Sequence, residues 1–443
     1  NDGGASGITP TMATLNGDLI STGAASTTAF LYWGTTDGGT NPGSWQNTNT
    51  VSQAAVGLFW VNLSGLSDGT TYWYRAYATN SFGDAWAPAS TNFTAGYAGE
   101  SVIEHNLFDA TDEFNPGPNV VFVSNTVGYA FYIDTDGDAP RYRKTQNSGT
   151  TWGNEAQMST NDLDWANIAI WYDQWTPADS NGTKIHVAAV EAVSDDLWYT
   201  YLDTANDSLR PGGWVQINTT NGLDYSAASD GNVSITKATD GNLFAWVASG
   251  FVMSSNGIVA RSTNAGTNWT QIGGTAEGFN DDNDWAQLLP LSGGDVLIIM
   301  QDTSANVAQS KVWDAGGSAW DGSFATIDAW TESGNYDTPW GATLDKYTGD
   351  IYLIGLNAVN SIDTDLSAYK FDESSRTWSF LSEVYANCSN LLQGTVAIDE
   401  NSGALYAVYL RGALTETMNI YYRTSTDDGL SWRNVTHIAN AFW

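Results

Sequence analysis

The chain has 443 residues, of which 49 are Asp or Glu and 15 are Lys or Arg, so its formal net charge at pH 7 is −34. This balance excludes general binding to nucleic acids or to anionic membrane surfaces, because both need clustered basic side chains. Charged residues make up only 14% of the chain, whereas it has 21 Trp, 21 Tyr and 45 Gly residues, a composition that predicts a β-rich globular protein with a large core.

The composition also bears on location. Scarce lysine and abundant Ser, Thr, Asn and Gly favour an extracellular or cell-surface protein. The single cysteine, Cys388, excludes an intramolecular disulfide. The longest clear apolar run, residues 296–300, is far shorter than the roughly 18 residues that span a bilayer, so no transmembrane segment is expected. Asn-x-Ser/Thr sequons occur about as often as chance gives in so Asn-rich a chain, so a glycoprotein is permitted but not indicated.

Residues 1–95 read as one β-sandwich. Short apolar runs near residues 11–17 and 29–34 predict early strands, and residues 72–77 alternate in the way that places two sets of side chains on opposite faces of a strand. Leu66 precedes Tyr72 by six residues, the spacing of the tyrosine corner in β-sandwiches. This segment resembles a fibronectin type III domain, which implies a spacer or a docking module.

Residues 96–117 are predicted to be a linker, ending in the Pro-Gly-Pro sequence at 116–118. Soon after it, Asp134, Asp136 and Asp138 alternate around Gly137. Carboxylates so spaced can wrap Ca²⁺, as in the first half of an EF-hand loop, but the distal Glu of that motif is missing. A calcium site and a solvated turn therefore both remain open. The three scattered histidines and the lone cysteine give no ligand set for zinc or iron.

A repeated eight-residue pattern begins at residue 145. Ser/Thr-x-Asp/Asn-x-Gly-x-x-Trp occurs at 145–152, 262–269 and 425–432, with the defining residues Asn147, Gly149, Trp152, Asn264, Gly266, Trp269, Asp427, Gly429 and Trp432. The pattern resembles the Asp-box of sialidase-like propellers. It predicts a hairpin turn in which Asp or Asn caps backbone N–H groups, Gly takes a positive φ and Trp packs under the turn.

Weaker copies fill the gaps between these three hairpins. Tryptophans recur with spacings of 62, 55, 51, 58 and 54 residues, at Trp152, Trp214, Trp269, Trp320, Trp378 and Trp432. A period of 50–60 residues with about four strands per unit is typical of a β-propeller. The last unit is expected to have strands at 394–398, 404–410, 418–424 and 431–438. The predicted fold is therefore all-β, with an N-terminal fibronectin type III-like sandwich and a six-bladed propeller over residues 118–443.

The resemblance raises the question of sialidase chemistry, which needs three arginines for a substrate carboxylate, a Tyr–Glu nucleophile pair and an Asp acid. Arg143, Arg261 and Arg423 stand in equivalent strands ahead of the hairpins, where a structural use is expected. The other propeller arginines lack the Arg-Ile-Pro context of a sialidase site. No catalytic residue is assigned, and the prediction leans against an enzyme.

A second acidic pattern precedes the innermost strands of two blades. It consists of Asp162, Asp164 and Trp165, and of Asp282, Asp284 and Trp285. Because such positions converge near the axis of a propeller, these carboxylates and aromatics could form a site for glycans or cations. The alternative is repeat-encoded turn capping with the tryptophans in the core between blades.

Two functions from different classes follow. The first is a non-catalytic extracellular structural or adhesive protein that self-assembles into a surface layer or filament, because rigid β-domains with many Tyr and Trp residues suit heterologous contacts. The alternative is a secreted glycan-binding or glycan-degrading propeller protein, motivated by the acidic axial pattern and the aromatic content. The sequence favours the first.

Overall fold

A computed structural model describes residues 1, 4–6, 8, 11–52, 54–67, 70–95, 103, 117–134, 139–159, 165–191, 196–217, 232–247, 257–279, 283–302, 307–329, 340–360, 363–386, 391–411 and 418–441. The chain folds as two compact units, Asn1–Ile103 with Gln146–Trp152 and Glu104–Thr145 with Gly153–Trp443. The protein is all-β, as predicted. The described helices are short 3-10 turns at η1 (Pro42–Ser44), η2 (Asp173–Trp175), η3 (Thr275–Glu277) and η4 (Ser292–Gly294).

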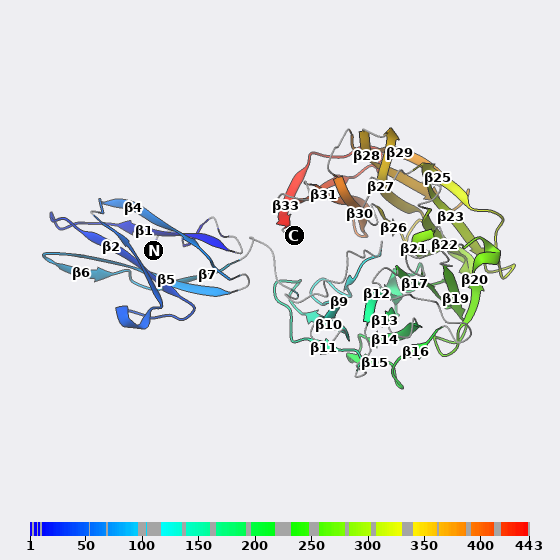
Figure 1. Cartoon of the computed structure of the whole chain (residues 1–443), viewed down its shortest axis with the longest axis horizontal. Helices are drawn as coiled ribbons and strands as arrows, with labels where there is room; N and C mark the ends of the chain where they lie inside the picture. The colour runs from blue at the N-terminus through cyan, green and yellow to red at the C-terminus, as the bar shows by residue number, and fades with distance from the viewer. Residues whose placement is uncertain are drawn as a thin grey trace. The chain divides into compact units, whose positions relative to one another are not determined.

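The first unit contains two antiparallel sheets (Figure 1). One sheet pairs β1 (Met12–Leu19) with β4 (Gly57–Ser64). The other has the order β3-β2-β5-β6, with β7 also paired to β5; its strands are β2 (Thr28–Gly34), β3 (Asn47–Val51), β5 (Thr71–Asn80), β6 (Gly83–Trp86) and β7 (Thr91–Thr94). Period-two alternation in β1, β2 and β5 buries every second side chain, which makes a core of residues such as Leu15, Leu31 and Tyr74.

The contact expected from the Leu66–Tyr72 spacing is present. The Ser67 N–H donates a hydrogen bond to the Tyr72 hydroxyl over 3.0 Å, and both Leu66 and Tyr72 are buried. The predicted linker, residues 96–117, lies outside the described residues apart from Ile103 and Gly117.

The second unit contains six antiparallel sheets, each built from consecutive strands. The first three comprise β8 (Val120–Phe122), β9 (Gly128–Asp134), β10 (Ala139–Thr145) and β11 (Ala156–Gln157); β12 (Trp165–Tyr172), β13 (Lys184–Glu191), β14 (Asp196–Asp203), β15 (Ser208–Leu209) and β16 (Val215–Gln216); and β17 (Val233–Lys237), β18 (Leu243–Val247), β19 (Ile258–Ser262) and β20 (Thr270–Gly273).

The last three sheets repeat the pattern. They comprise β21 (Asn283–Pro290), β22 (Val296–Asp302), β23 (Val307–Asp314), β24 (Ala319–Trp320) and β25 (Ala325–Ala329); β26 (Trp340–Leu344), β27 (Ile351–Asn360), β28 (Asp363–Asp372) and β29 (Thr377–Tyr385); and β30 (Leu391–Asp399), β31 (Ala404–Arg411), β32 (Met418–Ser425) and β33 (Thr436–Ala441). Figure 1 shows the six sheets following one another around a ring in chain order, the arrangement of a six-bladed β-propeller.

One boundary in the last blade differs from the expectation. The fourth strand was expected at 431–438 but begins at Thr436. Residues 431–435 complete the preceding turn instead, in which the Arg433 N–H donates to the Thr424 carbonyl over 2.9 Å. The hairpin turn therefore takes residues that the sequence pattern alone assigns to the strand.

Side chains connect the innermost strands of neighbouring blades. Among the described residues, backbone pairing occurs within each sheet and not between sheets. The Ala286 N–H donates to Asn232 Oδ1 over 2.8 Å, which links β21 to the residue before β17. The Gln287 amide bonds both the N–H and the carbonyl of Ala342, at 3.1 and 3.0 Å, and so links β21 to β26. Buried backbone groups need such partners, so these polar residues hold the blades in register.

Candidate functional site

The three hairpins with the repeated pattern share one turn geometry. Gly149, Gly266 and Gly429 have φ angles of 81°, 78° and 81°, a backbone conformation that glycine adopts without strain. In the third hairpin Asp427 accepts hydrogen bonds from the Ser431 N–H, at 3.0 Å, and from the Ser425 hydroxyl, at 2.7 Å.

The other two hairpins use an asparagine in the same way. Asn147 accepts from the Thr151 N–H over 3.0 Å, and Asn264 accepts from the Asn268 N–H over 2.8 Å. The acidic or amide residue is thus occupied in shaping the turn. We therefore assign these residues a structural role in the hairpin turns.

The acidic pattern expected at the axis lies mostly outside the described residues. Asp162, Asp164 and Asp282 are not described, and the side chain of Asp284 is not either. Trp165 and Trp285 are described, and only 1% and 6% of their surfaces are exposed. These two indoles belong to the hydrophobic core, where close packing leaves their faces no room for a ligand. A site formed by the acidic residues beside them remains a prediction.

The candidate calcium loop also falls outside the described part. Asp136 and Asp138 are not described, and Asp134 ends β9 with its side chain undescribed. Among the described residues, no group of three or more His, Cys, Asp or Glu side chains could hold a metal ion. The calcium site remains a prediction.

A buried chain of polar groups lies in the second blade. His186 Nε2 is 3.0 Å from Asp173 Oδ1, and His186 Nδ1 is 2.8 Å from the Tyr199 hydroxyl. Lys237 Nζ bridges Asp173, at 2.6 Å, and Asp179, at 2.7 Å. A neutral imidazole satisfies both contacts, because Nε2–H donates to the carboxylate and Nδ1 accepts from the hydroxyl.

Burial and hydrogen bonds keep His186 neutral and Asp173 ionised at neutral pH. Burial lowers the pKa of His186, against the opposing effect of Asp173. Burial acts to raise the pKa of Asp173, but its hydrogen bonds to His186, Lys237 and the Lys184 N–H hold that pKa well below its usual value. The three linked residues Asp173, His186 and Tyr199 are each less than 5% exposed, so a substrate does not reach them and their role is structural.

A different cluster lies between the fifth and sixth blades; we call it the Arg–Tyr cluster. It consists of Tyr385 at the end of β29, Tyr409 and Arg411 on β31, and Tyr421 and Arg423 on β32. The Arg411 and Arg423 guanidinium carbons lie 5.3 and 5.0 Å from the centre of the Tyr385 ring, and Arg411 Nη1 donates to the Tyr385 hydroxyl over 2.9 Å. Tyr409 contacts the rings of Tyr385 and Tyr421, each with a centroid separation of 5.9 Å.

The strand register explains why these side chains meet. Tyr409 pairs directly with Tyr421, while Arg411 lies two residues further along β31 and Arg423 two residues further along β32. Residues two apart in a strand share a face, so all four point to the same side of the sixth sheet. That side faces the fifth blade, where Leu405 and Ala407 pack with Leu366 and Val384 in one core cluster.

The charge of this cluster is unbalanced. Ion pairs among the described residues occupy Arg141, Lys144, Lys237, Arg261, Lys346, Lys370 and Arg376. Neither Arg411 nor Arg423 has a carboxylate partner in the described part of the chain, although acidic residues outnumber basic ones by 49 to 15. Two like charges beside one ring repel each other, and an anion bound between them would relieve that repulsion.

The cluster combines buried and accessible polar groups. Arg411 is exposed and Arg423 half-buried, whereas Tyr409 is only 2% exposed. Burial raises the pKa of Tyr409, and the nearby Arg423 guanidinium opposes the rise without forming a hydrogen bond of good geometry to the hydroxyl. The Tyr409 hydroxyl therefore stays protonated at neutral pH and acts as a donor rather than as a base.

Sequence reasoning missed this cluster. It set Arg423 aside as structural because the same strand position carries Arg143 and Arg261 in other blades. Those two are used differently: Arg143 donates to the Tyr132 hydroxyl and the Gly153 carbonyl, and Arg261 lies over Phe244 and Trp313 near Asp240. The signal that could have found the site is Arg411, which has no equivalent in the repeat, two residues from Tyr409.

No helix among the described residues is long and apolar enough to cross a membrane. Neither a known protein family nor a curated protein matches this sequence.

Solved structures resemble the fold at low identity. An ulvan lyase of polysaccharide lyase family PL25, bound to a glucuronate–sulfated rhamnose unit, is 9% identical, with a TM-score of 0.46 over 76% of this chain and 86% of that one. Trypanosoma rangeli sialidase in complex with the inhibitor DANA is 12% identical, with a TM-score of 0.44 over 69% and 53%. The Hadza microbial sialidase Hz136 is 11% identical, with a TM-score of 0.39 over 91% and 90%. Since these values are too low to transfer a site, the function has to be argued from this chain's own residues.

Proposed function

We propose that this is a secreted glycan-binding protein whose propeller holds acidic glycans at the Arg–Tyr cluster. The observation that carries the proposal is the pair of guanidinium groups, Arg411 and Arg423, placed on the Tyr385 ring without a carboxylate partner among the described residues. Arginine presents a planar fork that matches carboxylate and sulfate oxygens.

Binding is favoured over bond cleavage by the protonation state of Tyr409. A lyase or hydrolase needs a group that takes or gives a proton near neutral pH. The raised pKa of Tyr409 removes that hydroxyl as a base, and the buried His186 is enclosed in the second blade. The groups that remain in the cluster are hydrogen-bond donors and cations, which suit recognition of an anion.

Calorimetric titration of the full chain tests the proposal, with hyaluronan and chondroitin sulfate oligosaccharides as acidic ligands and cellohexaose as a neutral one. We expect the acidic ligands to bind and Arg411→Gln or Arg423→Gln to weaken their binding roughly 10- to 100-fold, because a charge-assisted hydrogen bond contributes about 1.5–3 kcal/mol. Arg210→Gln is the matched control, since Arg210 is half-buried and donates only to the carbonyls of Pro211 and Gly213. Equal affinity of all three variants for the acidic ligands, or no binding by the parent protein, refutes the site.

One observation favours self-assembly as a second function. Strand β4 pairs with β1 alone among the described strands, and its outward side chains Leu58 and Trp60 are 66% and 62% exposed. Charged residues, especially Lys, and Pro normally protect the edge of a sheet from pairing, and β4 contains none of them. A second copy of the chain could therefore pair with the edge of β4.

Sedimentation velocity distinguishes this second function. Because the chains repel at a net charge of −34, association should increase as salt is raised from low ionic strength. Leu58→Lys should abolish it, while Tyr347→Lys, at another exposed apolar position, should not. A monomer at all salt concentrations removes this candidate.

A further inference from the structure

The first unit carries four aromatic side chains on the outer face of its larger sheet; we call them the aromatic row. They are Phe30 and Tyr32 on β2, Tyr77 on β5 and Trp86 on β6. Phe30 pairs with Tyr77, and Tyr77 pairs with Trp86, so three of the rings stand in register across three neighbouring strands.

The rings contact one another directly. Tyr77 lies 4.7 Å from Trp86 and 5.8 Å from Phe30 between ring centres, and Tyr32 lies 5.1 Å from Trp86. Neighbouring positions of the same strands, Leu31, Ala76 and Ala29, point into the core, so by alternation the aromatic row faces away from it. All four residues are half-buried.

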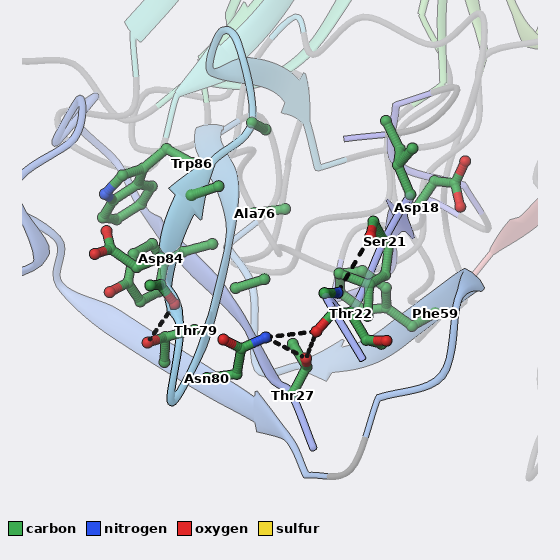
Figure 2. Close-up of a pocket in the computed structure, with 18 of the residues that line it drawn as sticks. Asp18, Ser21, Thr22, Thr27, Phe59, Ala76, Thr79, Asn80, Asp84 and Trp86 are labelled. Carbon is green, nitrogen blue, oxygen red and sulfur yellow. Dashed lines mark hydrogen bonds between the residues drawn. The ribbon is translucent and has the colours of Figure 1, made fainter. Parts of the chain in front are cut away.

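The polar atoms of the row have no protein partner. The hydroxyls of Tyr32 and Tyr77 and the indole N–H of Trp86 make no hydrogen bond among the described residues, so each is available to a ligand. Asp84 lies two residues from Trp86 and on the same side of β6, as Figure 2 shows, and its carboxylate is likewise unpaired in the described part. The row is therefore amphipathic: flat apolar faces bordered by free donors and acceptors.

The charge of the surface limits the ligand. Arg75, beside Tyr32 across the strand pair, donates to the carbonyls of Ala87 and Pro88 at 2.8 Å each, so its guanidinium is held against the backbone. Asp84 and Asp37, which interacts electrostatically with Arg75, carry the opposite charge, so the surface has no excess of positive charge and differs from the cationic Arg–Tyr cluster. Thr48 and Thr50 on β3 add hydroxyls beside Tyr32 and Phe30.

We propose that the aromatic row is a second glycan-binding site, which takes an extended neutral oligosaccharide. Sugar rings present flat C–H faces to aromatic rings and hydroxyls at their rim, which is the pattern of this surface. Neighbouring strands are roughly 4.8 Å apart, so the row from Phe30 to Trp86 spans about two strand spacings, about the length of two sugar units. A site for neutral glycans in the first unit is independent of the acidic-glycan site proposed for the propeller.

Titration calorimetry of the full chain with cellohexaose, xylohexaose, laminarihexaose and mannohexaose tests this site. We expect at least one of them to bind, and Trp86→Ala and Tyr77→Ala each to weaken that binding roughly tenfold through loss of a stacking surface. Trp60→Ala is the control, because it removes an exposed tryptophan from the other sheet of the same unit. Circular dichroism and the melting temperature establish that the variants are folded.

Variants of the propeller site distinguish this proposal from the proposal for acidic glycans. The double change Arg411→Gln and Arg423→Gln should leave the affinity for neutral glycans unchanged, whether or not acidic glycans bind. The proposal is overturned if no neutral hexasaccharide binds, if Trp86→Ala and Tyr77→Ala bind like the parent, or if Trp60→Ala loses as much affinity as they do.

Discussion

At the scale of single residues, several of the few basic side chains form ion pairs with carboxylates. Lys237 neutralises two carboxylates, Asp173 and Asp179, and Lys370 pairs with Asp350. Arg411 and Arg423 are used differently, because both guanidinium groups lie over one tyrosine ring, that of Tyr385. The proposed function rests on that pair of guanidinium groups.

The buried His186 predicts a stability that depends on pH. The folded state holds the pKa of His186 below its usual 6.5, so between these two values the unfolded chain binds more protons than the folded one. The contribution of His186 to the free energy of unfolding is therefore fully present above pH 6.5 and is lost as the pH falls below that value. The lowered pKa of Asp173 adds a second loss below about pH 4.

Thermal unfolding from pH 8 to pH 5 measures this effect. The melting temperature should fall below pH 6.5, and His186→Gln, which cannot be protonated, should flatten that part of the curve. An unchanged slope in the variant would show that another group is responsible.

The close approach of Gly266 to Tyr199 predicts a specific packing cost. An added Cβ would lie 1.9 Å from the Tyr199 ring, at a φ of 78°, so Gly266→Ala should destabilise the protein by the clash and by the backbone strain together. Gly241 has a φ of 85° with nothing within 4 Å of an added Cβ, so Gly241→Ala isolates the strain of about 1–2 kcal/mol. Chemical denaturation should rank Gly266→Ala as the less stable variant by about 1 kcal/mol or more; equal stability would mean that Tyr199 moves aside freely.

At the scale of the elements, several of the recurring tryptophans donate a hydrogen bond from the indole N–H to the preceding blade. The indole N–H of Trp214 donates to the Met158 carbonyl, that of Trp320 to the Ile272 carbonyl and that of Trp432 to the Ser382 hydroxyl, at 2.9, 2.9 and 3.0 Å. The period seen in the sequence is thus the period of the contacts between blades.

Trp378 offers the test of this role. Its N–H donates to the buried Ser310 hydroxyl over 2.9 Å. Trp378→Phe keeps a ring but leaves Ser310 without this donor, at a cost of about 1–3 kcal/mol. Denaturant titration measures it, with Trp60→Phe, at an exposed position, as the unaffected control; an equal loss in both would contradict a hydrogen bond between the blades.

The elements were also what the sequence predicted best. Alternation and glycine-centred turns are local features, so the strands around residues 72–77 and the last blade could be placed before the structure was known. The burial of Trp165 and Trp285 could not be predicted, because the same Asp-x-Asp-Trp pattern fits an indole in the core or at the axis. The grouping of Arg423 with Arg411 could not be predicted for a related reason: a repeat predicts the backbone of each blade, but not which copy has a neighbour such as Arg411.

At the scale of the whole molecule, the two units offer surfaces of different chemistry. The propeller has a cationic cluster between its fifth and sixth blades, and the sandwich has an aromatic face without an excess of positive charge. In a chain with a net charge of −34, an anionic ligand is repelled at long range, so its binding at the propeller should strengthen as salt screens that field and weaken again at high salt.

The most direct test is a crystal structure of the protein soaked with an acidic oligosaccharide such as a hyaluronan hexasaccharide. We predict that carboxylate oxygens of the glycan lie within hydrogen-bonding distance of the Arg411 and Arg423 guanidinium groups. A glycan bound elsewhere on the propeller, with these arginines paired to a carboxylate of the protein itself, would contradict the account.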